Sequence, residues 1–161
     1  MVLEDKLNLK GTLEIYSRNV GDTEWTLEDT IHNVVTTLGF QTIANHLTNS
    51  GIYKTTNFLY FAWSNGTSTP APADTAASFY ADGTCATKAI QSVEVFDSGN
   101  LRQVWNCFLS STDNTPASIT KFALMNANPG TVMFNNVKFA AKSKTNLKEY
   151  YFRYWLTMSQ V

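Results

Sequence analysis

The chain has 161 residues, of which 13% are aromatic and 16% charged, and its formal net charge is -1. This length is typical of one domain and is sufficient for a hydrophobic core without disulfide or metal support. The near-neutral charge provides no cationic field for a polyanion, so we expect no nucleic-acid partner. No apolar run reaches the roughly 18 residues of a membrane span, so no membrane partner is expected either.

The composition favours β structure. Aromatic residues, Thr and Val are frequent, and they suit half-buried pleated surfaces better than long solvated helices. We therefore expect a single mainly β domain over residues 1–161. Residues 1–6 lack the cationic and apolar parts of a secretory signal, which predicts synthesis and folding in the cytoplasm.

The first elements are a hairpin and a helix. Alternating apolar and polar residues predict a strand over residues 12–16, and a turn then leads to a second strand near residues 25–28. The period changes over residues 36–49, where four apolar residues share one helical face, with a Thr before them and Gly51 after them as end signals. The four residues are Phe40, Ile43, Ala44 and Leu47, and the candidate caps are Thr36 and Thr37.

A strand and a long loop form the centre of the chain. Residues 57–63 are apolar on both faces, which predicts a buried central strand. Residues 64–82 hold many turn-forming residues and few apolar ones, so we expect an irregular loop. Because long loops in compact domains are usually functional, this loop is expected to contact a neighbouring subunit.

The remaining residues predict antiparallel strands. A hairpin is expected around the turn at residues 97–100, and three further strands follow it. Roughly eight strands at this spacing predict a jelly-roll-like antiparallel β-sandwich with one short α-helix. The expected strands cover residues 86–96, 101–109, 119–125, 131–139 and 149–158.

The last strand carries aromatic residues on both faces. Tyr150, Phe152, Tyr154, Leu156 and Met158 alternate with a second set of residues. The first set is expected in the core, and the second is expected to meet another subunit. The second set is Tyr151, Arg153, Trp155 and Thr157.

The sequence contains no recognisable catalytic or metal-binding motif. His32 and His46 are the only histidines and do not form a paired ligand motif. Cys85 and Cys107 have no metal-binding spacing; we expect them to be reduced and buried, although a disulfide between them stays open. The aspartates of turn-like segments are expected to cap backbone N–H groups. They are Asp74, Asp82, Asp97 and Asp113. We predict no catalytic residue, no cofactor and no metal.

A glycan-binding module is an alternative interpretation. Ser, Thr and Asn side chains in the loops would hydrogen-bond a sugar, and an exposed Trp would provide a stacking platform. In this alternative the platform is Trp63, at the start of the long loop. All four Trp residues lie in predicted strands, however, which favours core positions.

The order of motifs resembles a family of tailed-bacteriophage virion proteins. In that family an Asn-hydrophobic-Val-x-x-x-Gly helix start precedes an aromatic strand that ends in a Gly-Thr-Thr-x-Pro-x-x-x-Asp-Thr loop. The corresponding residues here are 33–39, 60–70 and 74–75. The resemblance continues through residues 119–125, 130–134 and 154–158. The chain departs from the pattern at Lys121, where the family has an acidic residue, at Ala123, where it has Gly, and in a longer loop after residue 75.

The resemblance implies a non-enzymatic virion structural protein, made in the host cytoplasm. We expect a capsid decoration protein that binds the head surface and stabilises it through self-association. Its partners would be copies of itself, in a trimer or another symmetric oligomer, and the major capsid protein. A tail, baseplate or fibre adaptor that contacts tail proteins is the alternative, although no heptad or collagen-like repeat marks a fibre shaft. The expected assembly contacts are Trp63, Asn65, Pro70, Pro72, Asp74, Tyr151, Arg153 and Trp155.

Overall fold

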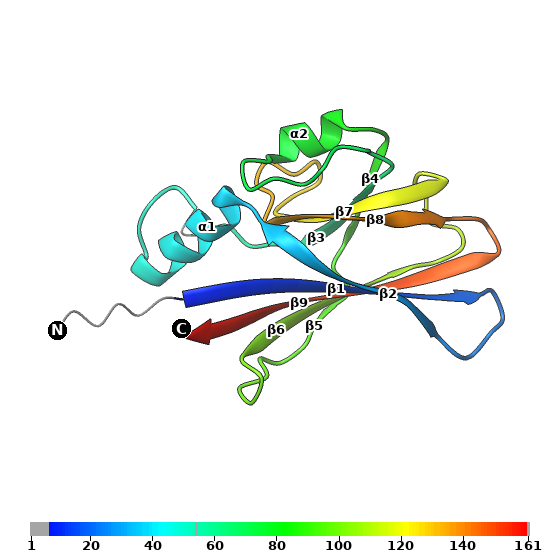
Figure 1. Ribbon diagram of the computed structural model, residues 1–161, viewed down its shortest axis with the longest axis horizontal. Coiled ribbons are helices and arrows are strands. Elements are labelled where there is room, and N and C mark those ends of the chain that lie inside the picture. Colours follow the sequence, from blue (N-terminus) through cyan, green and yellow to red (C-terminus); the bar gives the residue numbers. More distant parts are fainter. Residues whose placement is uncertain (1–6, 54, 161) are drawn as a thin grey trace.

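The fold is mainly β, as the composition predicts (Figure 1). The computed structural model describes residues 7–53 and 55–160, so the expectation for residues 1–6 lies outside the described residues. The elements in chain order are β1 (Leu7–Asn19), β2 (Thr26–Val35), α1 (Thr37–Thr48), β3 (Tyr60–Ser64), α2 (Ala76–Ala81), β4 (Cys85–Ala89), β5 (Ser92–Val93), β6 (Arg102–Leu109), β7 (Ser118–Met125), β8 (Asn135–Ser143) and β9 (Lys148–Gln160).

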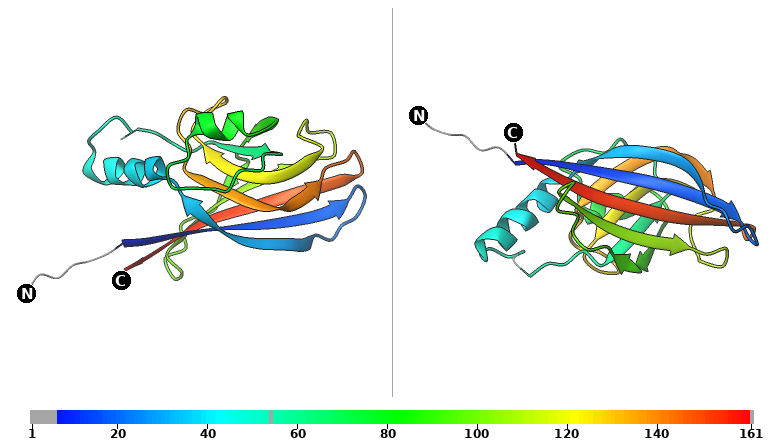
Figure 2. Two further views of the ribbon diagram at one scale, coloured as in Figure 1. Left: turned by 45° about the horizontal axis from the view of Figure 1, so that its top comes forward. Right: turned by 90° about the horizontal axis from the view of Figure 1, so that it is seen from below.

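All nine strands form one curled antiparallel sheet in the order β4-β3-β7-β8-β2-β1-β9-β6-β5. Its two halves are joined by a short pairing of β2 with β8, in which Val34 lies opposite Asn136 and Val35 opposite Asn135. The two edge strands, β4 and β5, are separated by only two residues, so the chain itself bends from one half into the other. The halves therefore face each other in a sandwich-like arrangement (Figure 2).

The core lies between the two halves. Tyr150, Phe152, Tyr154 and Leu156 of β9 are buried, which confirms the predicted inner face of the last strand for these residues, whereas Met158 is only half-buried. Across the core the ring of Phe152 lies 5.3 Å from that of Trp63. The prediction of a buried strand in the centre of the chain is confirmed for residues 61–63, whereas Leu59, which precedes β3, is half exposed.

The predicted helix is present, but its buried face differs from the expected one. Thr36 is the N-cap and accepts a hydrogen bond from the backbone N–H of Gly39, and Asn49 ends the helix in the left-handed region. Gly39 and Thr42 are buried, whereas Phe40 and Leu47 are exposed. Phe40 and Leu47 therefore face outward, whereas Ile43 packs against the core as predicted. Gly39 is buried because only a residue without a side chain fits against the backbone of Phe134, in the segment before β8.

A second helix was missed. Helix α2 lies within residues 64–82, where an irregular loop was predicted. Thr75 and Ser78 form a capping box at its start, and Ala76 and Phe79 bury themselves against the outer face of β3 and β7. A helix of six residues is too short to show a helical period, so only its capping residues signal it.

Two strand predictions also need correction. Residues 86–96 do not form one arm of a hairpin: the segment is split into β4, which pairs with β3, and β5, which pairs with β6. The expected strand over residues 131–139 begins at Asn135 and extends to Ser143. In both cases the apolar pattern continues through a bend, and periodicity alone does not locate the bend.

Gly39 provides a test of the close packing of α1 against the backbone of Phe134. A Cβ at this position would lie 2.4 Å from the backbone carbonyl oxygen of Phe134. Alanine is favoured over glycine in helices by about 1 kcal/mol, whereas overpacking that moves backbone costs about 1–3 kcal/mol. We expect Gly39→Ala to lower the free energy of unfolding measured by urea denaturation. Gly99→Ala is the control, because its Cβ meets nothing closer than 3.4 Å; equal or higher stability of Gly39→Ala would contradict this seating.

Candidate functional site

Apart from Trp63, the predicted assembly contacts lie on two opposite outer faces. Residues 64–82 cover the half-sheet that contains β3, β7 and β8, whereas β9 belongs to the other half (Figures 1 and 2). Tyr151, Arg153 and Trp155 alternate with the buried residues of β9 and so lie on its outer face. The structure therefore does not bring the two predicted sets together.

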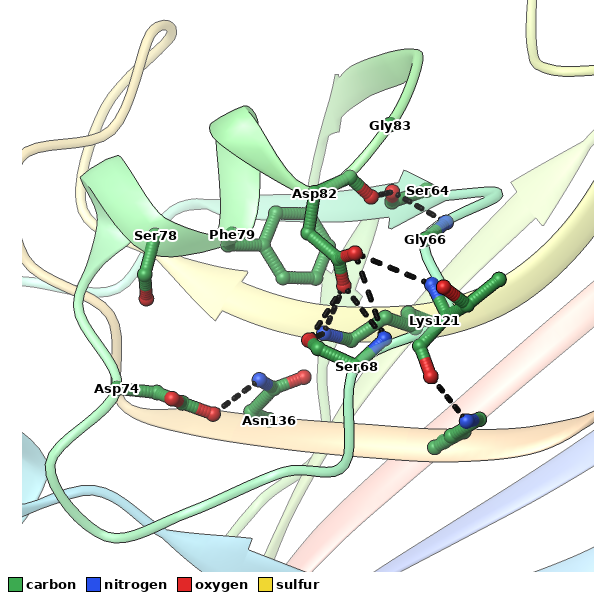
Figure 3. Close-up of polar contacts among 12 residues, drawn as sticks. Ser64, Gly66, Ser68, Asp74, Ser78, Phe79, Asp82, Gly83, Lys121 and Asn136 are labelled. Carbon is green, nitrogen blue, oxygen red and sulfur yellow. Dashed lines mark hydrogen bonds and ion pairs between the residues drawn. The ribbon is translucent and has the colours of Figure 1, made fainter.

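A buried ion pair holds the long loop to its own sheet (Figure 3). The Lys121 ammonium, whose side chain is 1% exposed, lies 2.7 Å from Asp82 Oδ2 and donates to Ser68 Oγ at 2.8 Å. The same carboxylate accepts hydrogen bonds from the backbone N–H groups of Thr67 and Ser68. The hydrogen bond from Lys121, followed by that from Ser68, holds the pKa of Asp82 well below its usual value.

This ion pair gives Lys121 a partner on the outer face of the sheet. Lys121 lies on β7 and points to the outer face, where the end of α2 places the carboxylate of Asp82 above it. Gly66 is required beside it, because a Cβ there would lie 1.9 Å from the carbonyl oxygen of Asp82. The segment is thus packed on its own sheet, and its contact with a neighbouring subunit stays a prediction.

Two predicted contacts in this segment have internal roles. Trp63 is 0% exposed, so its prediction as an assembly contact is wrong, as is the alternative in which it forms a glycan platform. Its position on the inner side of β3 places its ring in the core. Asp74 accepts hydrogen bonds from Asn136 Nδ2 at 2.7 Å and from the backbone N–H of Ala71 at 2.8 Å, which ties the loop to β8. Asn65 and Pro72 are exposed, and Pro70 is half-buried.

The opposite face carries the second predicted set, and neither helix covers it. Tyr151, Arg153 and Trp155 are each half-buried. Arg153 donates to Glu94 Oε2 at 3.0 Å, and its guanidinium lies 5.6 Å from the ring centre of Trp155. The hydrogen bond from Arg153 lowers the pKa of Glu94. The side chains on this face are therefore held in place before any partner binds.

Sequence reasoning missed an aromatic cluster on the same face. Trp25 packs edge-on against Phe108, with 5.8 Å between ring centres, and lies 5.9 Å from Tyr151. The Arg18 guanidinium stacks over the Trp25 ring at 4.4 Å. Trp25 precedes β2, and no feature of the sequence pairs it with Phe108 of β6.

An apolar groove of about 400 Å³ lies beside α1 and was also missed. It lies between the helix, the segment before β3 and the inner surface of β6 and β9. His46 Nε2 lies 2.7 Å from the carbonyl oxygen of Thr56 and ties that segment to the helix. The helix signal at Leu47 and the aromatic strand were both visible in the sequence, but their proximity was not. The apolar lining residues are Ile43, Leu47, Phe58, Leu59, Trp105, Phe134 and Leu156.

Two other residues that the sequence analysis singled out, His32 and Asp97, have structural partners. His32 Nδ1 lies 3.2 Å from Thr12 Oγ1, and Asp97 accepts backbone hydrogen bonds from Gly99 and Asn100, as predicted for a turn. Within residues 7–53 and 55–160, no three His, Cys, Asp or Glu side chains are placed to hold a metal ion. Both cysteines are unpaired; Cys107 is buried as expected, and burial raises its pKa to about 12, whereas Cys85 is only half-buried.

Comparison with protein-family models, with curated proteins and with solved structures finds no match to this chain. Among the helices that the structure describes, none is long and apolar enough to cross a membrane. The surfaces described above are therefore interpreted from their own geometry.

The ion pair between Asp82 and Lys121 leads to a prediction about stability. Replacing Asp82 by Ala leaves the buried Lys121 ammonium without its counter-charge, and breaking a pair in which both charges are buried costs about 3–5 kcal/mol. Because the Asp82 side chain is 20% exposed, we expect Asp82→Ala to lower the free energy of unfolding by less, about 1–3 kcal/mol, as for a buried donor left without its partner. The double variant Asp82→Ala/Lys121→Met removes the unpaired charge and should recover part of the loss. Urea denaturation at pH 7 measures the free energy of unfolding of both variants. Equal stability of the wild type and Asp82→Ala would contradict a stabilising role of the ion pair.

The same pair predicts a dependence on pH. Because the pKa of Asp82 is lower in the folded than in the unfolded chain, its stabilisation is complete above the unfolded value of about 4 and is lost as the pH falls below it. The stability difference between the wild type and the double variant should therefore shrink between pH 5 and pH 2 (approximate bounds of that titration). A difference that stays constant over this range would show that Asp82 does not titrate in this way.

Proposed function

We propose that the chain is a non-enzymatic structural protein of a tailed-phage virion and acts as a capsid decoration protein. The resemblance in motif order supports this role. The observation that carries it is the outer face of β9, which neither helix covers (Figure 1). On this face Tyr151, Arg153 and Trp155 form one row, because they alternate with the buried residues of the strand. A decoration protein needs such a rigid, amphipathic surface to bind the shell.

The chemistry of this face suits binding to another protein. Aromatic and Arg side chains contribute most to interface energies, because they bury large areas and lose little freedom when they are already held in place. Trp155 has the guanidinium groups of Arg102 and Arg153 at 5.9 and 5.6 Å from its ring centre. Glu94 and Glu14 fix Arg153 from both sides. The row thus presents ordered apolar surface bordered by charge.

The opposite face is less suited to this role. There the loop is tied to the sheet by Asp82 and Lys121, and its predicted contact residues are small or polar, such as Asn65 and Pro72. We therefore assign shell binding to the outer face of β9.

The test mixes purified protein with expanded, undecorated heads and images them by cryo-electron microscopy. We expect density on the head surface, and we expect Trp155→Ala to weaken binding by at least about tenfold, as for loss of a central interface aromatic. Ala77→Ser is the control, because Ala77 is exposed on α2 at the opposite face. Near-ultraviolet circular dichroism verifies that both variants fold.

Bare heads in the presence of wild-type protein would defeat the decoration role. Density on the tail of the complete virion, with none on the head, would favour the tail or baseplate adaptor instead. Equal binding by the wild type and Trp155→Ala would show that the head-binding surface is not the outer face of β9.

A further inference from the structure

Two cations flank one hydroxyl group on the outer face of the sheet. Strand β9 lies between β1 and β6, and Figure 2 shows these three strands side by side. Thr157 of β9 has Lys10 directly opposite it on β1 and Arg102 directly opposite it on β6. Directly opposed residues of antiparallel strands point to the same face of the sheet, so the three side chains stand in one line across the strands. We call Lys10, Thr157 and Arg102 the cross-strand line.

The cross-strand line belongs to the face that we assign to shell binding. Thr157 continues the outward alternation of β9, and the guanidinium of Arg102 lies 5.9 Å from the ring centre of Trp155 on the same face. Leu9 packs against the core, so its neighbour Lys10 points outward. Lys10 is exposed and the Arg102 side chain is 32% exposed. The line is therefore open to a partner that also covers Trp155.

The cross-strand line carries more positive than negative charge. Arg102 Nε donates to Asp97 Oδ2 at 3.1 Å, and among the described residues no acceptor bonds to its two Nη groups. Asp97 also accepts backbone hydrogen bonds from Gly99 and Asn100, so its carboxylate is shared with the turn. Lys10 forms no ion pair within residues 7–53 and 55–160. A single, shared carboxylate thus serves two cations.

Two other arginines of this face differ in this respect. Arg18 lies 2.8 Å from Glu149, and Arg153 receives Glu94 through two hydrogen bonds. Their charges are balanced within the free protein. Covering these pairs brings no unpaired cation into the interface, whereas covering the cross-strand line does. A partner that covers the line therefore has to supply a negative charge there.

The geometry suits a carboxylate group. Neighbouring strands are about 4.8 Å apart, so about 10 Å separates the Cα atoms of Lys10 and Arg102, and both long side chains can reach a group above Thr157. The two free Nη groups of Arg102 form a fork that a carboxylate fits with two parallel hydrogen bonds. Trp155 and Asp97 already hold this fork in place, which lowers the entropic cost of binding.

The surroundings favour an acidic side chain of a protein over the phosphates of a nucleic acid. A phosphate backbone is bound by a series of unpaired cations, whereas the next cation along this face, Arg153, is already neutralised by Glu94. The formal net charge of -1 also provides no long-range attraction for a polyanion. A single cationic site beside an aromatic side chain is instead typical of a protein–protein interface.

We propose that Lys10, Thr157 and Arg102 form a binding site for an acidic side chain of the shell protein, next to Trp155. The inference rests on the proposed function for the identity of the partner, whereas the chemistry of the site follows from the cross-strand line itself. It divides the outer face of β9 into an aromatic contact and a charged contact at the end of the strand.

The first test uses the purified protein and a small probe. N-acetylglutamic acid α-amide carries one carboxylate, and N-acetylglutamine α-amide is its neutral counterpart. Each is titrated at constant ionic strength and followed by two-dimensional amide NMR. We expect the backbone signals of residues 10, 102 and 157 to shift with the acid only, and Lys10→Gln to remove these shifts. Equal shifts with both probes, or none at these residues, would overturn the inference.

The second test measures binding to expanded, undecorated heads. Lys10→Gln and Arg102→Gln should each weaken binding by about tenfold, as for loss of a hydrogen bond between charged groups, whereas Lys10→Arg should retain it. Ala77→Glu is the matched control, because it changes the net charge by the same amount as Lys10→Gln but lies on the opposite face. Near-ultraviolet circular dichroism verifies that the variants fold.

The two tests separate this inference from the proposed function. If the acid probe binds at the cross-strand line but wild-type protein leaves heads bare, the carboxylate site stands and the decoration role falls. If heads bind the wild type, Lys10→Gln and Arg102→Gln equally, the decoration role stands and this inference falls. Equal weakening by Ala77→Glu would attribute the effect to net charge and would also overturn the inference.

Discussion

The structure depends on the contact between the start of α1 and the segment that leads into β8. The hydroxyl of Thr36 donates to the carbonyl oxygen of Met133, and the backbone N–H of Thr36 donates to that of Phe134. The same residue caps α1, and Gly39 in the first helical turn lies directly against Phe134. Thr36 thus lies between the end of β2 and the start of α1 and helps to join the two halves of the sheet. The halves pair there through only two residues of β2.

This contact also determines which side of α1 is buried. The close approach to Phe134 leaves no space for a side chain at Gly39, and Gly39 and Thr42 are the buried residues of the helix. A helix in a globular protein normally turns its apolar stripe to the core. Here the core is already filled by aromatic rings from β3, β7 and β9, as the stacked pair Phe122 and Phe152 illustrates. Of the apolar stripe only Ile43 packs against this core, and Phe40 and Leu47 stay accessible.

Much of the fold could be predicted, because the signals are local. The alternation in β9 identified its buried face, and Thr36 marked the start of α1; the C-cap is Asn49, two residues before the predicted Gly51. The features that were missed depend on residues far apart in the chain. Lys121 and Asp82 are 39 positions apart in the sequence. Trp25, which precedes β2, contacts Phe108 of β6, although β1 and β9 lie between β2 and β6 in the sheet. Trp63 is instructive: a large aromatic residue next to a polar loop fits a binding site or a core equally well, and only its direction on the strand decides.

The three outer surfaces of the protein differ in the chemistry of their side chains. On the loop face, the polar groups that could bind a partner are engaged with one another, as Asp82, Ser68 and Lys121 show. On the outer face of β9 the aromatic and Arg side chains are fixed but uncovered. At the end beside α1 the groove is lined mainly by apolar side chains, together with the polar residues Thr42, His46, Thr56 and Asn57. A partner that covers this end therefore has to provide hydrogen-bond partners for these polar groups as well as apolar contacts.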